Sequence, residues 1–196
     1  MTKISPLLIT LSHQSIPGGL EAYTHYLLRA FPSLRVWDRS TVVRRNLPVV
    51  HDIQVGSNAA KKIADMHEKP PLLLANGLHG WAVSPRARFP PLVGIFHGTY
   101  SGLAERAYSI SDPVYWKMNY FLAPMEKKSA RNATLCVANS PFTQRELKSK
   151  YGVESRVIEP PIDEKVFAPV SKSRAQKIQG WSANTKHVLF VGNPTY

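Results

Sequence analysis

The amino-acid sequence predicts an α/β fold: a Rossmann-like, doubly wound and mostly parallel sheet, followed by the start of a second domain. Three observations support this prediction. Short apolar runs of strand length alternate with segments of helical periodicity. Several runs are almost continuously apolar, which is typical of parallel strands covered on both faces. The helical segments begin at capping residues and end at glycine or proline.

The expected strands are short and evenly distributed along the first part of the chain. We place them at residues 7–11, 34–37, 49–55, 72–75, 92–96, 134–138 and 156–159. Helices are expected between them, at about 20–31, 57–67, 114–131 and 141–151. Ser57 is expected to cap the second helix, Pro124 to kink or divide the third, and Gly152 to close the fourth.

The pattern near the carboxyl terminus indicates two domains. Residues 1–169 form the predicted Rossmann-like domain, and residues 170–196 carry a linker, a helix at 172–181 and a strand at 187–192. Because one strand without a following helix cannot complete a domain, we interpret 170–196 as the beginning of a truncated second domain.

Composition narrows the expected partners and compartment. The net charge of +12 favours an anionic partner: an acidic membrane surface, a phosphorylated substrate or nucleic acid. Nucleic acid is not expected, because the sequence lacks a recognition motif for it. The single cysteine, Cys136, lies in an apolar run and indicates a reducing compartment. Without an apolar stretch of about 20 residues or a signal-peptide pattern, a soluble cytoplasmic protein is expected, with peripheral association at the inner membrane face left open.

A glycine pair lies in the first loop, between a strand and a helix. Gly18 and Gly19 would let a ligand approach the backbone at a helix amino terminus, where anions are favoured. The alternative is that the pair only permits a tight turn. The spacing does not fit G-x-G-x-x-G, which disfavours a nicotinamide enzyme.

Polar residues follow three of the predicted strands, at the edge of the sheet where such folds bind ligands. His79 follows the strand at 72–75, His97 and Gly98 follow the strand at 92–96, and Asn139 and Ser140 follow the strand at 134–138. Either histidine could instead be a hydrogen-bonded structural residue, and Ser140 could act as a helix cap.

The long helix at 114–131 has two possible roles. It carries one apolar stripe, formed by Val114, Met118, Phe121, Leu122 and Met125. It also places Trp116 and Tyr120 among basic residues, namely Lys117, Lys127, Lys128 and Arg131. The first pattern favours a helix packed on the core, and the second favours a surface that rests on anionic lipid.

Other site patterns are absent from the sequence. There is no Asp-x-Asp pair, no cluster of cysteines and histidines, no P-loop and no Gly-x-Ser-x-Gly motif. Metal-dependent chemistry is therefore not expected, and neither is a cofactor.

Four segments together resemble the retaining glycosyltransferases of family 4, which have the GT-B fold. They are Pro17-Gly18-Gly19-Leu20-Glu21, Phe96-His97-Gly98, Val137-Ala138-Asn139-Ser140, and the run from Lys150-Tyr151-Gly152-Val153 to Val166-Phe167-Ala168-Pro169. The resemblance implies that this domain holds mainly the acceptor, a glycan or lipid. A second domain would hold the UDP- or GDP-sugar donor with a Glu-x7-Glu motif beyond Tyr196.

The resemblance also assigns roles to residues. His97 resembles the catalytic-site histidine that contacts the transferred sugar. Substrate-binding residues are expected at Gly18, Gly19, Glu21, His79, Gly98, Asn139 and Ser140. Two other functions stay open: a sugar-nucleotide epimerase of the same fold, and a non-catalytic basic binding module.

Overall fold

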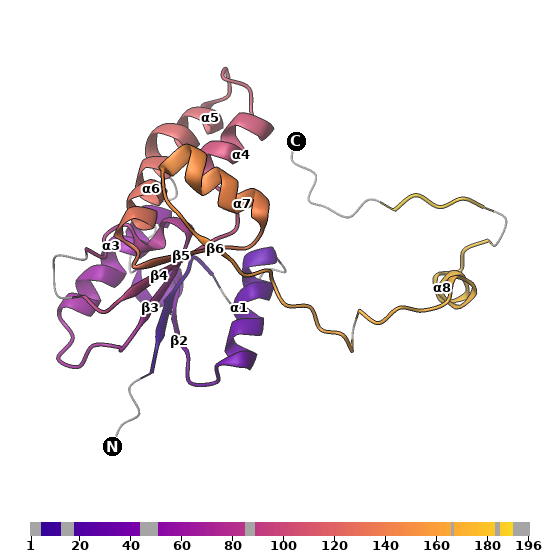
Figure 1. Ribbon diagram of the computed structural model, residues 1–196, viewed down its shortest axis with the longest axis horizontal. Coiled ribbons are helices and arrows are strands. Elements are labelled where there is room, and N and C mark those ends of the chain that lie inside the picture. The colour runs from indigo at the N-terminus through magenta and orange to yellow at the C-terminus, as the bar shows by residue number, and fades with distance from the viewer. Residues whose placement is uncertain are drawn as a thin grey trace. The chain divides into compact units, whose positions relative to one another are not determined.

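The computed structural model describes residues 5–12, 18–43, 51–84, 89–165, 167–182 and 185–189. The chain divides into two compact units, residues 1–160 and 161–196. The first unit contains the sheet and most of the helices (Figure 1).

Six parallel strands form one sheet in the first unit. They are β1 (Leu7–Ile9), β2 (Arg35–Trp37), β3 (Leu73–Asn76), β4 (Leu92–Phe96), β5 (Leu135–Ala138) and β6 (Arg156–Val157). Their order is β2-β1-β3-β4-β5-β6, and every adjacent pair is parallel. The predicted fold class is confirmed. The strand order reverses between β1 and β3, because β2 is added on one side of β1 and β3 on the other. In folds of this class, ligands are expected at such a point, outside the carboxyl ends of the strands.

The helices mostly follow the predicted pattern. They are α1 (Gly19–Ala30), α2 (Arg39–Val42), α3 (His51–Ala64), α4 (Tyr100–Ala107), α5 (Pro113–Lys117), α6 (Ala123–Asn132), α7 (Pro141–Glu146) and α8 (Lys172–Gln179). A 3-10 turn, η1 (Gly77–Gly80), and two π turns, η2 (Met118–Leu122) and η3 (Leu147–Tyr151), complete the set.

The division expected at Pro124 is present. Asp112 caps α5, and η2 separates α5 from α6 just before the proline. Gly152 closes the segment after α7 in the left-handed conformation, with φ of 71°. That conformation favours glycine, and the predicted end of this helix is confirmed.

The strand expected at 49–55 and the cap expected at Ser57 are both wrong. Residues 49 and 50 lie outside the described residues, while 51–55 form the first turns of α3. Ser57 lies inside this helix, and its hydroxyl donates to the carbonyl of Gln54. The buried residues Val55, Ala59 and Ile63 recur at intervals of four, so the helical period decides the structure of the segment.

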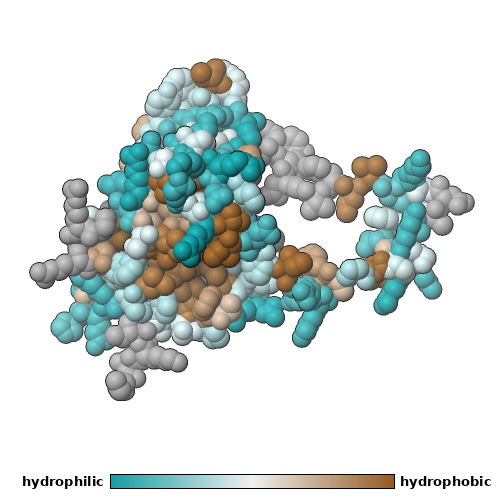
Figure 2. Space-filling view, viewed as in Figure 1, coloured by the Kyte–Doolittle hydropathy of each residue, from teal (hydrophilic) through white to brown (hydrophobic). Residues whose placement is uncertain are grey.

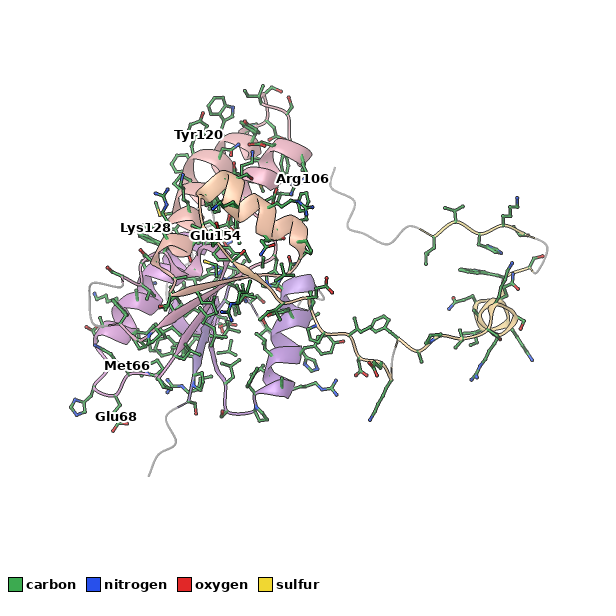
Figure 3. The ribbon with its side chains drawn as sticks, in the orientation of Figure 1. Met66, Glu68, Arg106, Tyr120, Lys128 and Glu154 are labelled. Atoms are coloured by element: carbon green, nitrogen blue, oxygen red, sulfur yellow. The ribbon has the colours of Figure 1, made fainter. Side chains whose placement is uncertain are left out.

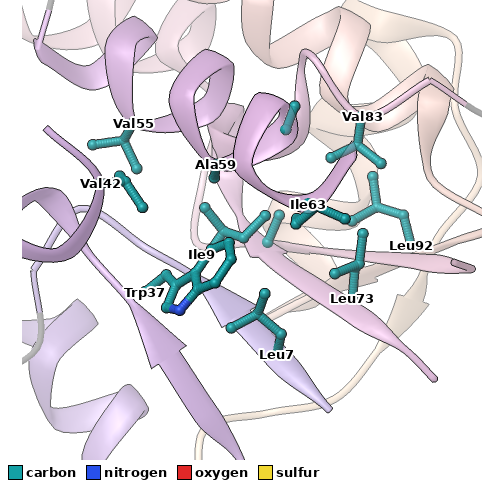
Figure 4. Packing of buried hydrophobic residues seen from close by; sticks show 12 residues of the cluster. Leu7, Ile9, Trp37, Val42, Val55, Ala59, Ile63, Leu73, Val83 and Leu92 are labelled. Carbon is teal, nitrogen blue, oxygen red and sulfur yellow. The ribbon is translucent and has the colours of Figure 1, made fainter. Parts of the chain in front are cut away.

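Helices cover both faces of the sheet. Leu7 and Ile9 point to one face and pack with Ile63 of α3, as Figure 4 shows. Leu8 points to the other face and packs with Tyr23 of α1. This alternation along β1 is the period of a strand that is buried on both sides.

A smaller cluster fills the sheet beside β5. It contains Phe96, Ala130, Cys136 and Tyr151. Cys136 is buried, and burial raises the pKa of its thiol to about 11. The thiol is therefore protonated at neutral pH and acts as a small apolar core residue, as its surrounding sequence predicted.

The second unit contains α8, which Ser171 caps and Gly180 closes with φ of 66°. The rings of Trp181 and His187 stack with their centroids 4.5 Å apart. The expected strand at 187–192 lies partly outside the described residues, and its described part, 187–189, has no strand pairing. The division into domains at 169 stays a prediction.

Candidate functional site

A cavity of about 320 Å³ opens at the carboxyl ends of β3 and β4. Its wall comes from the end of β3, η1, the segment between β4 and α4, α4 itself, and single residues of α1 and α6. The lining residues are Leu20, Asn76, Gly77, Leu78, His79, His97, Gly98, Thr99, Tyr100, Leu103, Arg106 and Glu126. The cavity thus lies beside the point where the strand order reverses, as expected for this class of sheet.

The loop that carries His97 is fixed by two buried carboxylates. Glu126 of α6 accepts a 2.7 Å hydrogen bond from the main-chain N–H of Tyr100. Glu146 of α7 accepts a 3.1 Å hydrogen bond from the main-chain N–H of Thr99. Two different helices therefore hold the residues that directly follow Gly98, and through them they position the imidazole.

Glu146 makes further contacts that order this loop. It accepts a hydrogen bond from the hydroxyl of Thr99 and forms an ion pair with Arg106, which lines the cavity. The Arg106 guanidinium also lies 4.8 Å from the centroid of the Phe142 ring. Because the carboxylates occupy the first N–H groups of α4, this helix end is not available to an anion.

His97 is half-buried and lies at the cavity wall. Tyr23 meets its ring edge-on, with the centroids 4.8 Å apart. Burial lowers the pKa of His97, so the imidazole is neutral at neutral pH. Its Nε2 is buried and has no hydrogen-bond partner in the described part of the chain. A ligand hydroxyl can supply that partner.

His79 lies deeper, in η1, and is 5% exposed. Its Nδ1 lies 2.6 Å from the carbonyl oxygen of Asn76, so Nδ1 donates and Nε2 is left as an acceptor. Burial lowers the pKa of His79, although the charge of Asp52 opposes this shift. Within the described residues, His79 Nε2 and Asn76 Oδ1 are buried without partners. Both residues line the cavity.

Glu126 contributes a carboxyl group that can change its charge near neutral pH. Burial raises its pKa to about 7, against the lowering effect of hydrogen bonds from Tyr151 and Tyr100. The Tyr151 hydroxyl donates to Oε2 over 2.5 Å. Oε1 lies toward Gly77, at 3.3 Å from the place where a Cβ on Gly77 would be. The cavity therefore contains two neutral imidazoles and one titratable carboxyl group, a set suited to hydroxyl groups.

The glycine pair borders this region at the start of α1. Gly18 is the residue before the helix and has φ of −128°, which any residue can adopt, and no described side chain caps α1. A Cβ on Gly19 would meet no atom within 4 Å. The conformation of Gly18 and the packing at Gly19 therefore do not require glycine. The alternative of a tight turn stays open. Residues 13–17 lie outside the described part.

The other predicted site residues are placed as follows. Gly98 lines the cavity and has φ of 147°, which favours glycine. Glu21 lies in the first turn of α1 and does not line the cavity. Asn139 and Ser140 accept hydrogen bonds from Thr143 at the start of α7, so their side chains hold that helix and do not line the cavity either.

Sequence reasoning missed several residues of the site, above all Glu126 and Arg106. Arg106 was missed because α4 was not predicted. Glu126 is surrounded in sequence by Lys127 and Lys128, which suggests a solvated face. Its spacing of four from the buried residues Leu122 and Ala130 was the signal that it points inward.

Metal binding finds no support in the described ranges. Among these residues, no three histidine, cysteine, aspartate or glutamate side chains gather closely enough to hold an ion.

Comparisons with known proteins place the chain in a family. The sequence profile described as Glycosyltransferase Family 4 matches residues 39–166, nearly two thirds of the chain. No curated protein matches the chain.

Three solved structures are similar to this chain at low sequence identity. Os79 from O. sativa in complex with UDP is 11% identical, with a TM-score of 0.42 over 77% of this chain and 50% of that chain. TcCGT1 in complex with UDP is 13% identical, with a TM-score of 0.43 over 89% and 48%. A UDP-glucosyltransferase from Polygonum tinctorium capable of glucosylating indoxyl is 14% identical, with a TM-score of 0.42 over 88% and 55%.

The chain spans about half the length of these solved structures. The family profile confirms the resemblance drawn from the sequence motifs, and it covers the strand ends that form the cavity. The chain belongs to Glycosyltransferase Family 4.

Proposed function

We propose that this chain is the acceptor-side part of a glycosyltransferase that moves a sugar from a UDP- or GDP-sugar donor to an acceptor hydroxyl. Transfer occurs with retention of configuration and without a metal ion. The bond between the sugar and the diphosphate breaks, a bond to the acceptor oxygen forms, and the hydroxyl proton leaves with the diphosphate. The donor is held mainly by a second domain.

The observation that carries the proposal is the cavity at the carboxyl ends of β3 and β4, beside the strand-order reversal, into which neutral imidazoles point. His97 and His79 each have a buried Nε2 without a partner in the described part of the chain. A hydroxyl-bearing ligand satisfies such nitrogens, and leaving them unpaired costs roughly 1–3 kcal/mol each. Because both imidazoles are neutral, they suit sugar or acceptor hydroxyls better than phosphate groups.

In this proposal the donor diphosphate lies at the start of α1 and not against the two histidines. The start of α1, at Gly18 and Gly19, has no capping side chain among the described residues, and a Cβ on Gly19 would meet no described atom within 4 Å. Its free N–H groups and the helix dipole favour negative charge, which grows on the diphosphate as the sugar leaves. The α4 end cannot take this role, because Glu126 and Glu146 already occupy it.

The experiment is product analysis with the complete protein, in which the second domain accompanies this chain. Incubation with a UDP- or GDP-sugar and candidate glycan or lipid acceptors should give a glycosylated product, free nucleoside diphosphate and a retained anomeric configuration by NMR. EDTA should leave the rate unchanged. Conversion of the donor sugar to its epimer without transfer would contradict the proposal, and so would inversion at the anomeric carbon.

A further inference from the structure

A second surface lies away from the cavity, along α5, η2 and α6. It includes the exposed residues Trp116, Tyr120, Phe121, Pro124, Lys128 and Arg131 and the half-buried Lys117, and we call this set the α5–α6 face. One end of the face is aromatic and the other is basic. Figure 3 shows Tyr120 and Lys128 on the same side of the first unit, while Arg106 lies on another side.

The aromatic end is exposed, although a core-facing helix was one of the two roles expected for it. Phe121 and Val114 belong to the predicted apolar stripe, yet they are 63% and 37% exposed, and no residue of α5 is buried. Only Leu122 of that stripe is fully buried. Tyr120 is 62% exposed and Trp116 is 45% exposed. The core-packing interpretation is therefore wrong for α5 and the outer side of η2.

The aromatic side chains form an organised apolar cluster. The rings of Trp116 and Tyr120 stack at 5.0 Å with an angle of 18°, and the Trp116 indole N–H donates to the carbonyl of Ile110 over 2.6 Å. Ile110 itself is 66% exposed, in the loop between α4 and α5. Figure 2 shows a small hydrophobic patch at this tip of the first unit, among residues of intermediate hydropathy.

An apolar groove lies beside the cluster. Its volume is about 630 Å³, and its lining includes Ile53, Pro113, Val114, Trp116 and Phe121, together with Lys117. The combination of exposed aromatic rings, an apolar groove and an adjacent cation provides room for hydrocarbon beside a partner for a negative group.

The solvent-facing side of residues 113–132 carries positive charge and no exposed carboxylate. Residues 113–132 contain four cations, Lys117, Lys127, Lys128 and Arg131, and Glu126 is the only carboxylate among them. Glu126 is 4% exposed and points inward to Tyr100 and Tyr151. The α5–α6 face therefore presents positive charge without a compensating exposed carboxylate from its own helices.

We propose that the α5–α6 face docks on the surface of an anionic lipid bilayer. The aromatic end enters the boundary between headgroups and acyl chains, the groove takes hydrocarbon, and the lysines lie at the level of the lipid phosphates. Charge complementarity selects this occupant. No described helix is long and apolar enough to cross a bilayer, and the contact needs none. The inference is independent of the proposed sugar transfer.

Two other occupants fit the observations less well. Single-stranded nucleic acid would stack its bases on open aromatic faces, but Trp116 and Tyr120 stack on each other, which covers one face of each ring. A second copy of the chain would bring the same cations against themselves, because a twofold contact pairs a surface with its own copy.

The test is sedimentation of the full chain with vesicles of phosphatidylcholine alone or of phosphatidylcholine with phosphatidylglycerol. Binding should require phosphatidylglycerol and weaken as salt rises above about 0.1 M, where the Debye length falls below about 10 Å. The double variant Lys117→Glu, Lys128→Glu should bind at least about 25-fold more weakly, since each basic residue near an acidic surface contributes about fivefold.

The matched control is Lys61→Glu, Lys62→Glu, on exposed positions of α3. It changes net charge by the same amount. Each double variant also removes one contact between a lysine and a tryptophan ring, Lys128 with Trp81 in the first and Lys62 with Trp37 in the control. The control should retain binding to within about threefold, so that any larger loss in the first variant reports the place of the charge and not its total.

Insertion of the aromatic end is measured separately. Addition of anionic vesicles should shift tryptophan emission to the blue in the wild type, and this shift should disappear in Trp116→Phe while sedimentation with vesicles persists. Phe121→Ser should weaken binding. Equal loss in both lysine double variants, binding to neutral vesicles alone or no binding would overturn the proposal. A lipid-free dimer abolished by Phe121→Ser would overturn it too, as would tighter binding to an oligonucleotide that the same variants weaken.

Discussion

The main-chain N–H of Tyr100, at the start of α4, donates a 2.7 Å hydrogen bond to Oε2 of Glu126 in α6. The same oxygen accepts the hydroxyl of Tyr151. One buried oxygen thus connects the loop that carries His97 to α6 and to η3. The charge of that oxygen matters for both stability and ligand binding.

Replacing Glu126 with leucine should lower the free energy of unfolding by roughly 3 kcal/mol, because a buried N–H and a buried hydroxyl lose their acceptor. Glu126→Gln should cost less, since an amide oxygen still accepts both hydrogen bonds. Urea unfolding followed by circular dichroism measures both values. Glu105→Leu, at a surface ion pair with Lys150, is the control and should change stability by less than about 1 kcal/mol. Equal costs for Glu126→Leu and Glu105→Leu would show that the buried acceptor contributes nothing.

The raised pKa of Glu126 predicts a direction for the pH dependence of stability. The folded pKa is about 7 and the unfolded value is near 4.5, so between these values the folded state binds more protons. Stability from this group is therefore present at low pH and is lost as pH rises toward 7. The lowered pKa values of His79 and His97 act in the opposite direction below their ordinary value of 6.5.

The comparison with Glu126→Gln isolates the carboxyl group from these histidines. The free energy of unfolding of the wild type, relative to that of Glu126→Gln, should fall by roughly 3 kcal/mol between pH 4.5 and pH 8. Urea unfolding at a series of pH values provides the curve. A difference that is constant with pH, or that rises, would mean that Glu126 is ionised throughout.

His97→Ala should lower turnover of the complete enzyme by roughly 100-fold or more, if the imidazole contacts the transferred sugar. Its effect on stability should be small, because the ring is half-buried and its Nε2 has no partner among the described residues. His25→Ala, at an exposed position of α1, is the matched control for both measurements. Wild-type kinetics in His97→Ala would return this residue to a structural role.

Three glycine-to-alanine substitutions should change the stability of the protein in different directions. Gly19→Ala should stabilise the protein by roughly 0.5–1 kcal/mol, because a Cβ there meets no atom and α1 gains helix propensity. Gly102→Ala should destabilise it by about 1–3 kcal/mol, because the new Cβ overlaps the Glu146 carboxylate, which Thr99 and Arg106 hold in place. Gly98→Ala should also destabilise, through its φ of 147°. Thermal unfolding decides the three signs, and a stabilising Gly102→Ala would show that the carboxylate yields easily.

This chain without a second domain should show no sugar transfer, because the donor is proposed to bind elsewhere. The measurement is release of nucleoside diphosphate by purified residues 1–196, against the complete protein at equal concentration. Measurable transfer by the chain alone would contradict the two-domain assignment.

The sequence was sufficient for six of the seven strands expected before residue 160 and for the position of His97 at the end of β4. In a parallel sheet, an apolar run followed by a polar residue marks the carboxyl end of a strand. The sequence was insufficient for α3, where Ile53 and Val55 imitate the alternation of a strand, and the helical spacing of Ala59 and Ile63 becomes decisive only once the segment is extended. The role of Glu126 could not be deduced, because its partners, Tyr100 and Tyr151, are 26 and 25 residues away in sequence.

The widened turn at η2 also has a consequence for the two ends of the α5–α6 face. The N–H of Ala123 reaches the carbonyl of Met118, one residue further back than in an α-helix. Pro124, directly after it, lacks an N–H and could not continue an ordinary turn. The number of residues in η2 therefore determines the angle, measured around the helix axis, between the aromatic rings and the lysines. Removing one residue from it would rotate α5 by about 100° relative to α6, so the length of this segment, and not its composition alone, keeps both halves of the surface on one plane.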